Sequence, residues 1–566
     1  FALGGDSLLT LRVVAEARRR VDLHLQVRDV FLHPTVARLA AAVRGRGVEA
    51  AIPALPRDGR ALPASFGQAR LWVLEQLSPG SARYNMAGAF RLDGPVDPKT
   101  LAAALDRVAW RHAALRTTFE EVDGALVQVE HPAGPVLEVT AVDEADLDAT
   151  IRNFARRPFD LHSGPLARVA LLQLGPNQHA LLVNLHHAVA DGWSLAILVR
   201  DLGAAFQALP LPAPRLQYAD FAAWQRDVLS GPRLERELDG WRDALAGIEP
   251  LPLATDRPRP PVFDEAGDEV PFAVDAATTE ALAGLGRAHD ASLFMVLLAA
   301  FDLLLSRHAG DCDDVVVGAP VAGRTHPDTA ELVGFFVNTL ALRGDLRGDP
   351  TWIELLARVR ETCRAAFAHQ DAPFERVVDA LAVPRDLSRA PVFQVLFVFQ
   401  SQGEAVPAFG DDVRVTPLPA STGTTKVDLR LELVVGAEGL RGRLGYATAL
   451  FDRGTIEALA ERLGTLLRAV VAQPEARLSA LPLWTADELR AVERFEVGPA
   501  ADEPALSALL EGGDPEAIAV ISGGETLTYA QLDAEAAAVA DRLLALGIGP
   551  EARVGICARR GPRLIA

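Results

Sequence analysis

Cysteine is nearly absent from this chain. Of its 566 residues only Cys312, Cys363 and Cys557 are cysteine, and no two of them form a C-x-x-C pair. An odd and sparse set of this kind excludes a disulfide framework, which needs an even and dense set of cysteines. We therefore expect a protein of the reducing cytoplasm.

Basic residues are too few to balance the acidic ones. The net charge is −19, and all but two of the 56 basic residues are arginine, the lysines being Lys99 and Lys426. A nucleic-acid partner would need a basic surface to bind phosphates. We therefore expect no nucleic acid among the partners.

Long apolar runs and an amino-terminal targeting segment are also missing. No uninterrupted apolar segment reaches about twenty residues, the length that a membrane-spanning helix requires. The start, FALGGDSLLT, has neither an initiator Met nor a basic region followed by an apolar one. We expect no membrane partner, no signal peptide and a chain that begins inside a domain.

The residues that are present predict a globular protein of several domains. With 49% hydrophobic and 23% charged residues, 566 residues suffice for three or four domains. Residues 125–130 and 137–142 have strand composition, whereas residues 101–116 and 291–308 have helical spacing, so we predict a mixed α/β fold. Of two proline-rich interruptions, residues 250–261 mark the expected boundary between two lobes.

Residues 179–202 combine a strand, a polar loop and a helix. Residues 180–185 are rich in Leu and Val and predict a buried strand that ends at His186 and His187. The helix is predicted from Leu195, Leu198, Val199 and Leu202, which follow the spacing i, i+3, i+4 and i+7. Asp191 or Ser194 can cap its start. Both histidines, Asp191 and Gly192 are therefore expected on a loop between strand and helix.

The two histidines are expected to differ in role. Adjacent residues of an extended chain point to opposite faces, so one ring can act in chemistry while the other supports the loop. The same geometry argues against a zinc site, which would need both rings on one side. Asp191 is better interpreted as an orienting charge paired with an arginine. The alternative for an isolated motif is a satisfied pair of core histidines beside a helix cap.

Seven motifs occur in the order known for the condensation domains of nonribosomal peptide synthetases. The stretch 185–194, LHHAVADGWS, resembles the HHxxxDG signature of that family. The other six are SFGQARLWVL (65–74), RHAALRTTF (111–119), YADFAAWQ (218–225), GFFVNTLALR (334–343), HQDAPFERVV (369–378) and RDLSRAPVFQVLF (385–397). This resemblance implies two chloramphenicol-acetyltransferase-like lobes in a V, with a tunnel between them.

The resemblance also implies roles for the residues of the histidine motif. His187 matches the residue near the acceptor amine, where it acts as a general base or as a positioner, and His186 matches a supporting residue. Asp191 matches the carboxylate of a buried ion pair, for which Arg324 is the first candidate and Arg343 the second. Gly192 would leave the tunnel floor free of a side chain.

The flanking segments resemble two further domains of peptide synthetases. LGGDSLLTL resembles the attachment motif of peptidyl carrier domains, in which Ser7 would bear 4′-phosphopantetheine at a helix N-terminus. A loop and helix cap is the structural alternative for that motif, and a second short helix is predicted after Pro34. Residues 527–561 resemble the start of an adenylation domain. We expect a partial carrier domain at 1–48, a linker at 49–60, a condensation domain at 61–483 and an adenylation fragment at 484–566.

Several other features have simpler interpretations. STGTTK, residues 421–426, is similar to a phosphate-binding loop but lacks the G-x-x-x-x-G-K-[ST] pattern, so we predict an ordinary loop. Arg111 and His112 are expected to head a helix, and membership of a structural ion pair is the alternative to a role in the site. His369 is expected in lobe packing, and Tyr218, Phe221 and Trp224 on one apolar helix face.

Taken together, the resemblance implies peptide-bond formation between carrier-bound thioesters. The donor would come from the Ser7 carrier and the acceptor from a downstream carrier, with a phosphopantetheinyl transferase and the adenylation domain as further partners. The motifs favour the subtype that joins an L donor to an L acceptor. A D donor, or a noncatalytic recruitment domain of the same fold, are the alternatives. We expect no metal site.

Overall fold

The computed structural model describes most of the chain. The described residues are 36–43, 51–58, 61–384, 386–400, 406–496, 514–522 and 524–549, with the single residues 13, 17, 25, 29, 552, 554 and 555. Contacts divide the chain into two units, Phe1–Thr485 and Ala486–Ala566. Ser7 and Cys557 lie outside the described residues. The short helix predicted after Pro34 is α3, Val36–Val43.

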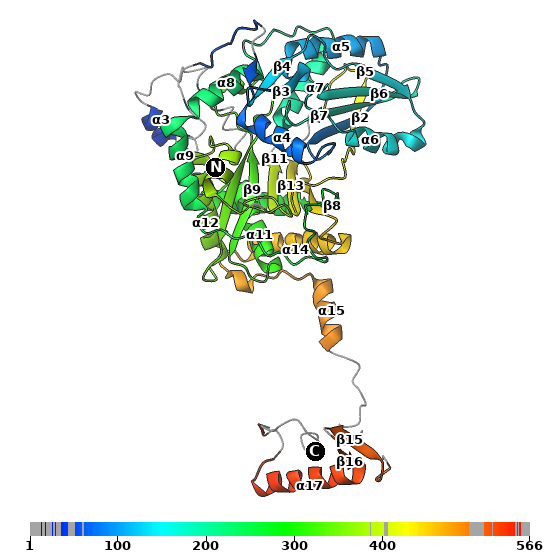
Figure 1. Cartoon of the computed structure of the whole chain (residues 1–566), viewed down its shortest axis with the longest axis vertical. Helices are drawn as coiled ribbons and strands as arrows, with labels where there is room; N and C mark the ends of the chain where they lie inside the picture. The colour runs from blue at the N-terminus through cyan, green and yellow to red at the C-terminus, as the bar shows by residue number, and fades with distance from the viewer. Residues whose placement is uncertain are drawn as a thin grey trace. The chain divides into compact units, whose positions relative to one another are not determined.

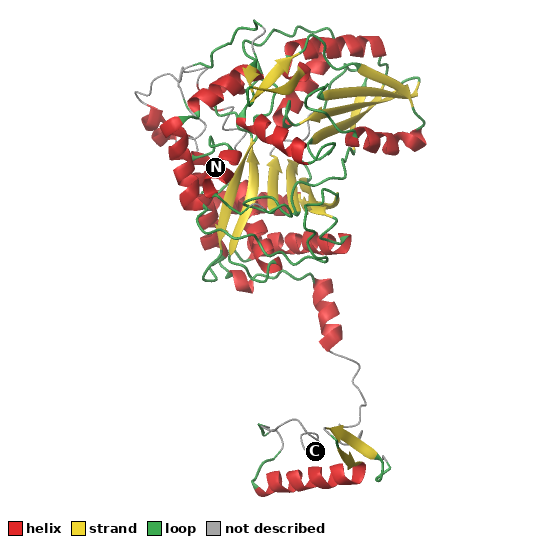
Figure 2. Cartoon of the chain, viewed as in Figure 1, coloured by secondary structure: helices red, strands yellow, loops and turns green. Residues whose placement is uncertain are grey.

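The first lobe is built on a five-stranded sheet (Figures 1 and 2). Its order is β12 (Arg414–Leu418), β2 (Asn85–Asp93), β7 (Gln178–His186), β6 (Ala167–Gly175) and β5 (Leu137–Ala141). Helices α5 (Pro98–Arg111) and α7 (Gly192–Phe206) pack on one face, and α6 (Leu147–Arg156) packs on the other. Side chains of β7 alternate between these two cores, as the period of two requires.

A small sheet and two helices complete this lobe. The sheet has the order β1 (Leu62–Pro63), β4 (Ala125–Glu130) and β3 (Thr117–Val122). Helix α4 (Phe66–Leu77) starts at a capping box, in which Ser65 and Gln68 satisfy each other's backbone amides. Helix α8 (Tyr218–Val228) packs beside β1.

The second lobe is built on a six-stranded sheet. Its order is β10 (Asn338–Asp345), β9 (Asp314–Val321), β11 (Val395–Gln400), β13 (Leu429–Gly436), β14 (Gly439–Ala447) and β8 (Gly267–Asp275). Its main helices are α10 (Ala276–Ala288), α11 (Leu293–His308), α12 (Trp352–Ala368), α13 (Phe374–Leu381) and α14 (Arg453–Ala472). Residues 295–306 of α11 are all buried, which explains why this helix is apolar on every side.

The predicted boundary between the lobes at residues 250–261 is wrong. Helix α9 (Gly231–Ala244) already packs Leu234, Leu238 and Trp241 into the core of the second lobe, so the chain changes lobe just before it. The chain then crosses back, because β12 pairs with β2 of the first sheet. Residues 421–428 return it to β13 of the second lobe.

The helix predicted over residues 101–116 is also shorter than expected. Helix α5 ends at Arg111, and residues 113–116 form a separate 3-10 turn. Arg111 and His112 therefore end a helix instead of heading one. Both side chains contact the Asp201 carboxylate at 2.9 Å, Arg111 in an ion pair and His112 in a hydrogen bond, because burial lowers the pKa of His112.

The described residues of the second unit, taken by itself, include two helices and one pair of strands. Helix α15 (Ala486–Glu496) is followed by the antiparallel pair β15 (Ile518–Ser522) and β16 (Glu525–Thr528). Helix α17 (Tyr529–Ala545) then starts at a Thr528–Gln531 capping box. Gly547, with a φ of 76°, follows its end in the left-handed region.

Candidate active site

The histidine motif stands at the end of a central strand of the first lobe. Strand β7 is paired on both sides, with β2 and with β6, so its last residue is firmly placed. The backbone amide of His186 donates to the Leu166 carbonyl and that of His187 to the Tyr84 carbonyl, both at 2.9 Å. The two rings therefore start from a backbone that is fixed on both edges.

His186 is a supporting residue by its contacts. Its side chain is buried, and its Nδ1 accepts a hydrogen bond from the Ala188 amide at 3.1 Å. Its ring packs edge-on against Phe159 at 6.0 Å between centroids. Burial, helped by the positive charge of Lys426, lowers the pKa of His186 to about 3. The ring is therefore neutral and locks the loop.

His187 has different neighbours and is only half-buried. Its ring packs edge-on against Phe335 at 5.6 Å and against Tyr84 at 6.4 Å. Burial, with smaller contributions from the charges of Lys426 and His186, holds the pKa of His187 well below its ordinary value. Of its two ring nitrogens Nδ1 is fully enclosed and Nε2 is not, and the backbone of Ala190 interacts with the ring. The arrangement presents a neutral imidazole with Nε2 available to a substrate.

Asp191 lies at the centre of a buried polar cluster that joins the two lobes. Its Oδ1 accepts from the Ser194 amide at 2.7 Å, which caps α7, and from Arg324 at 3.2 Å. Its Oδ2 accepts from the Phe336 amide at 3.0 Å. The side chains of Asp191 and Arg324 are both 0% exposed. The loop that carries the histidines is thus tied to the segment that follows β9.

Arg324 is held by more than its ion pair. It donates to the Leu332 carbonyl at 2.8 Å, to the Thr329 carbonyl and to Ser194 Oγ at 2.9 Å, and it lies 4.0 Å from the centre of the Phe336 ring. Arg343, the second candidate for this place, pairs with Asp314 instead. The geometry gives Asp191 an orienting role for the loop, since its oxygens are already occupied.

Gly192 is the first residue of α7 and is exposed. A Cβ added there would meet no atom within 4 Å. Open space therefore adjoins the loop at this point, and the Gly192 amide belongs to the positive end of a helix.

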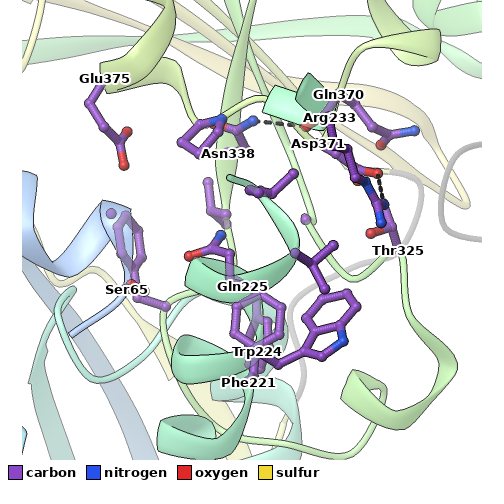
Figure 3. A pocket seen from close by; sticks show the side chains of 18 of the residues that line it. Ser65, Phe221, Trp224, Gln225, Arg233, Thr325, Asn338, Gln370, Asp371 and Glu375 are labelled. Atoms are coloured by element: carbon purple, nitrogen blue, oxygen red, sulfur yellow. Dashed lines mark hydrogen bonds and ion pairs between the residues drawn. The ribbon is translucent and has the colours of Figure 1, made fainter. Parts of the chain in front are cut away.

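A cavity lies beside the motif, between α8 and two segments of the second lobe (Figure 3). It encloses about 960 Å³ of empty space, including the part that is open to solvent. Figure 3 shows the amides of Gln225 and Asn338 and the carboxylate of Glu375 around this space, with Trp224 at one end. Polar and apolar side chains share the lining, so the cavity offers both hydrogen-bonding groups and aromatic surface to a ligand.

Phe335 stands between this cavity and His187. It lines the cavity, and its ring is the one that packs against the His187 imidazole. Gly67 makes room for it, because a Cβ on Gly67 would approach the Phe335 ring to 2.8 Å. The Tyr218 hydroxyl donates to the Phe335 carbonyl at 2.5 Å and lies 2.9 Å from Ser65 Oγ. The backbone of this wall is thereby fixed.

Sequence reasoning missed these two aromatic residues. Helix spacing predicts Tyr218 on an apolar helix face, and its ring does pack there, against Phe336 at 4.9 Å. The polar end of the same side chain reaches the site, which helix spacing alone does not indicate. Phe335 lies inside the motif GFFVNTLALR, and membership of that motif was the sequence feature that could have indicated its place in the site.

The remaining expectations concern groups outside the histidine motif. His369 contacts Glu237 at 3.1 Å, and its backbone carbonyl accepts from the Trp241 indole at 3.0 Å, so it serves packing. Residues 421–426 form a loop. Among the described residues no group of three or more His, Cys, Asp or Glu could hold a metal ion, and no single helix has the length and apolar composition to cross a membrane.

Comparison with known families identifies the domain. The family model "Condensation domain" matches residues 59–492, "Phosphopantetheine attachment site" matches residues 1–43 and "AMP-binding enzyme" matches residues 511–566. The chain therefore belongs to the condensation domain family, whose fold consists of the two α/β lobes described above. More specifically, it is a stretch of a nonribosomal peptide synthetase, with part of a carrier domain before the condensation domain and the start of an adenylation domain after it.

Curated relatives match over the whole chain. Tyrocidine synthase 3 of Brevibacillus parabrevis is 35% identical over 576 residues, and malpinin synthetase of Mortierella alpina is 39% identical over 597 residues. Each alignment covers 100% of this chain, but it covers only 9% of tyrocidine synthase 3 and 8% of malpinin synthetase. The chain thus corresponds to a small part of a much longer type of enzyme.

Solved structures share the fold. The X-domain from teicoplanin biosynthesis aligns with a TM-score of 0.72 and 32% identity, covering 76% of this chain and 100% of that one. A four-domain nonribosomal peptide synthetase in its holo form aligns with a TM-score of 0.73 and 26% identity, covering 86% of this chain and 39% of that one.

Proposed function

We propose that this chain forms a peptide bond between two carrier-bound thioesters. The acceptor α-amine attacks the carbonyl carbon of the donor aminoacyl or peptidyl thioester, and the donor chain passes to the acceptor. The observation that carries this proposal is the half-buried His187, whose Nε2 is not enclosed and whose neighbour Phe335 lines a cavity at the junction of the lobes.

The donor would be attached to Ser7 of this chain. Ser7 lies within the match to a phosphopantetheine attachment site, although outside the described residues. The bound 4′-phosphopantetheine would supply the thiol that carries the acyl group, after a phosphopantetheinyl transferase has added it. A downstream carrier would present the acceptor, which the adenylation domain in cis would activate. We assign all these steps to the cytoplasm.

The geometry supports a mechanism that relies on orientation. A thioester is already activated, so alignment of the two reactants alone can contribute roughly 7 to 11 kcal/mol. A general base works best when its pKa is near the working pH. Because burial lowers the pKa of His187 well below its usual range, this imidazole is better suited to accept a hydrogen bond from the amine than to remove its proton outright.

The remaining groups of the motif have supporting parts in this mechanism. His186 and Asp191 hold the loop, and Arg324 fixes Asp191. Open space at Gly192 leaves room for a substrate at the positive end of α7. We assign the L-donor, L-acceptor subtype on the stretches SFGQARLWVL and GSARYNMAGAF, with a D donor as the alternative.

Recruitment of another enzyme is the second candidate function. It is favoured by the similarity to the X-domain from teicoplanin biosynthesis, which has also been solved in complex with OxyB, at a TM-score of 0.71 to this chain. The intact HHAVADG motif argues for catalysis instead.

Intact-protein mass spectrometry tests this function. Ser7 is loaded with a panel of L- and D-aminoacyl donors by a phosphopantetheinyl transferase, and a separately prepared aminoacyl acceptor carrier is added. We expect the donor mass to leave this chain and appear on the acceptor, with L donors preferred. An acceptor carrier whose acyl group lacks an amine is the matched control. No transfer from any donor would contradict the proposal.

A further inference from the structure

One of the two lysines lies close to the histidine motif. Lys426 is on residues 421–428, the segment that returns from the first lobe to β13. This segment is anchored on both sides of the lysine. The Thr425 amide donates to the Glu265 carbonyl at 2.9 Å, and Asp428 accepts from Arg259 at 3.0 Å. These two contacts fix the backbone on either side of Lys426.

The ammonium of Lys426 lies over the ring that also borders His187. Its Nζ is 4.9 Å from the centre of the Tyr84 ring, and the same ring packs edge-on against the His187 imidazole at 6.4 Å. The Tyr84 carbonyl accepts the His187 amide. The charge of Lys426 is close enough to lower the pKa of both histidines. Tyr84 thus joins the lysine and the histidine in one site.

The Lys426 nitrogen has no polar partner. Among the described residues it makes no hydrogen bond or ion pair, although the side chain is half-buried. The nitrogen is not fully enclosed by protein atoms, so it borders accessible space. Within the described residues this half-buried ammonium contacts the Tyr84 ring, and a charge that no contacting anion or hydrogen-bond acceptor of the protein compensates favours a functional interpretation.

We propose that Lys426 is the proton donor to the thiolate that leaves during peptide-bond formation. This inference rests on the proposed function and deepens it. His187 holds the amine, and Lys426, which borders the same Tyr84 ring, meets the departing sulfur. The His187 imidazole then serves the attacking amine, and the Lys426 ammonium serves the leaving group.

The step balances without a further reactant. A bond forms between the amine nitrogen and the carbonyl carbon, and the carbon–sulfur bond breaks with its electron pair going to sulfur. Lys426 gives one proton to that sulfur, which leaves as a thiol. The amine loses its proton to solvent while His187 accepts its hydrogen bond, and Lys426 regains one proton from solvent. The products are an amide and a thiol, and both side chains return to their starting forms.

The charges around Lys426 are consistent with this role. Burial, followed by the positive charges of Arg430, Arg83 and Arg70, lowers the pKa of Lys426 to about 7, while Glu432 acts in the opposite direction. At neutral pH the protonated and neutral forms are therefore both populated, as a group that gives and regains a proton requires. The neutral rings of His186 and His187 and the Tyr84 side chain also lie near it.

Leaving-group dependence tests the proposal on the full chain. Soluble aminoacyl thioesters of N-acetylcysteamine and of thiophenol serve as donors to a loaded acceptor carrier. An alkyl thiolate needs a proton to leave well, whereas a thiophenolate does not. We expect Lys426→Met to slow transfer from the alkyl thioester about 100-fold and from the aryl thioester less than about threefold.

Two further variants separate proton donation from charge and from folding. Lys426→Arg keeps the charge but cannot give up a proton at neutral pH, so it should behave like Lys426→Met. Lys99→Met, at the other lysine, should match the wild type. The wild-type alkyl rate should fall as the pH rises above 7, and Lys426→Met should lose that dependence.

The other possible results distinguish failure of the proton-donor role from failure of the proposed function. Equal slowing of both thioesters, or full recovery in Lys426→Arg, would overturn the proton-donor role. If the wild type transferred neither thioester nor a Ser7-bound donor, the proposed function itself would fail.

Discussion

At the scale of single residues, the Asp191–Arg324 pair explains how the histidine loop keeps its shape. Both side chains are fully enclosed, and their remaining hydrogen-bonding groups are largely satisfied by backbone amides and carbonyls. A pair of this kind need not add stability by itself. Removing one partner is costly, because the other charge stays buried and uncompensated.

Replacing the arginine should therefore destabilise the first unit strongly. We expect Arg324→Met to lower the free energy of unfolding by about 3 to 5 kcal/mol, measured by urea denaturation. Arg347→Ala, which breaks the exposed Arg347–Asp345 pair, is the control and should cost less than about 1 kcal/mol. Equal stability of Arg324→Met and the wild type would contradict the account.

Gly192 offers a prediction in which activity and stability separate. A Cβ fits without contact, so Gly192→Ala should change the free energy of unfolding by no more than about 1 kcal/mol. If substrate uses this space, transfer should slow by about tenfold. Gly454→Ala, near the start of α14 and equally free of contacts, is the matched control and should leave transfer unchanged. Unchanged transfer in both variants would place the substrate elsewhere.

The residues of the histidine motif could be predicted from the sequence, whereas only some of the residues that contact them could be. His187 and Asp191 stand out because strand and helix periods flank them. Arg324 was named from family resemblance, since nothing in its own neighbourhood points to residue 191. Phe335 and Lys426 reach the site through contacts between segments far apart in the chain, which periodicity does not report.

At the scale of elements, local patterns predicted β7 and α7 well. The predicted helix residues fall within α7, which begins at Gly192 after the Asp191 cap. The crossing strand β12 and the lobe to which α9 belongs were not predicted. Pairing of β12 with β2 joins residues more than three hundred positions apart, and a short strand at a sheet edge carries little pattern of its own.

The contact between α4 and the Phe335 ring gives a prediction about this element. Gly67→Ala would force the ring to move, because the new Cβ would approach it to 2.8 Å. Overpacking of this kind costs about 1 to 3 kcal/mol, and movement toward His187 should slow transfer. Adding Phe335→Leu should restore both stability and rate, with Phe335→Leu alone as the control. Additive losses in the double variant would show that the two residues do not interact.

At the scale of the whole molecule, the segment before the condensation domain is docked. Ile52 is 0% exposed, its amide donates to Asp328 at 3.2 Å, and Arg57 pairs with Asp220 at 2.9 Å. Residues 49–60 were predicted as a semi-extended linker, and the described part, 51–58, lies against α8 and the segment after β9. Docking shortens the free tether between Ser7 and the lobes.

Releasing this segment should affect only a tethered donor. Ile52→Ala removes a buried side chain and should loosen the docking, which lengthens the tether and lowers the effective concentration of the donor. We expect transfer from Ser7 to slow several-fold, while transfer from a soluble thioester keeps its rate. Equal slowing of both would indicate damage to the site itself.

The proposed reaction depends on the His187 imidazole, which would hold the acceptor amine where the two lobes meet. Single-turnover transfer from loaded Ser7 to an acceptor carrier, followed by intact-protein mass spectrometry, measures this most directly. We predict that His187→Ala slows transfer by about 100-fold with unchanged thermal unfolding, and that His162→Ala, at an exposed histidine, has the wild-type rate. Equal rates for His187→Ala and the wild type would contradict the account.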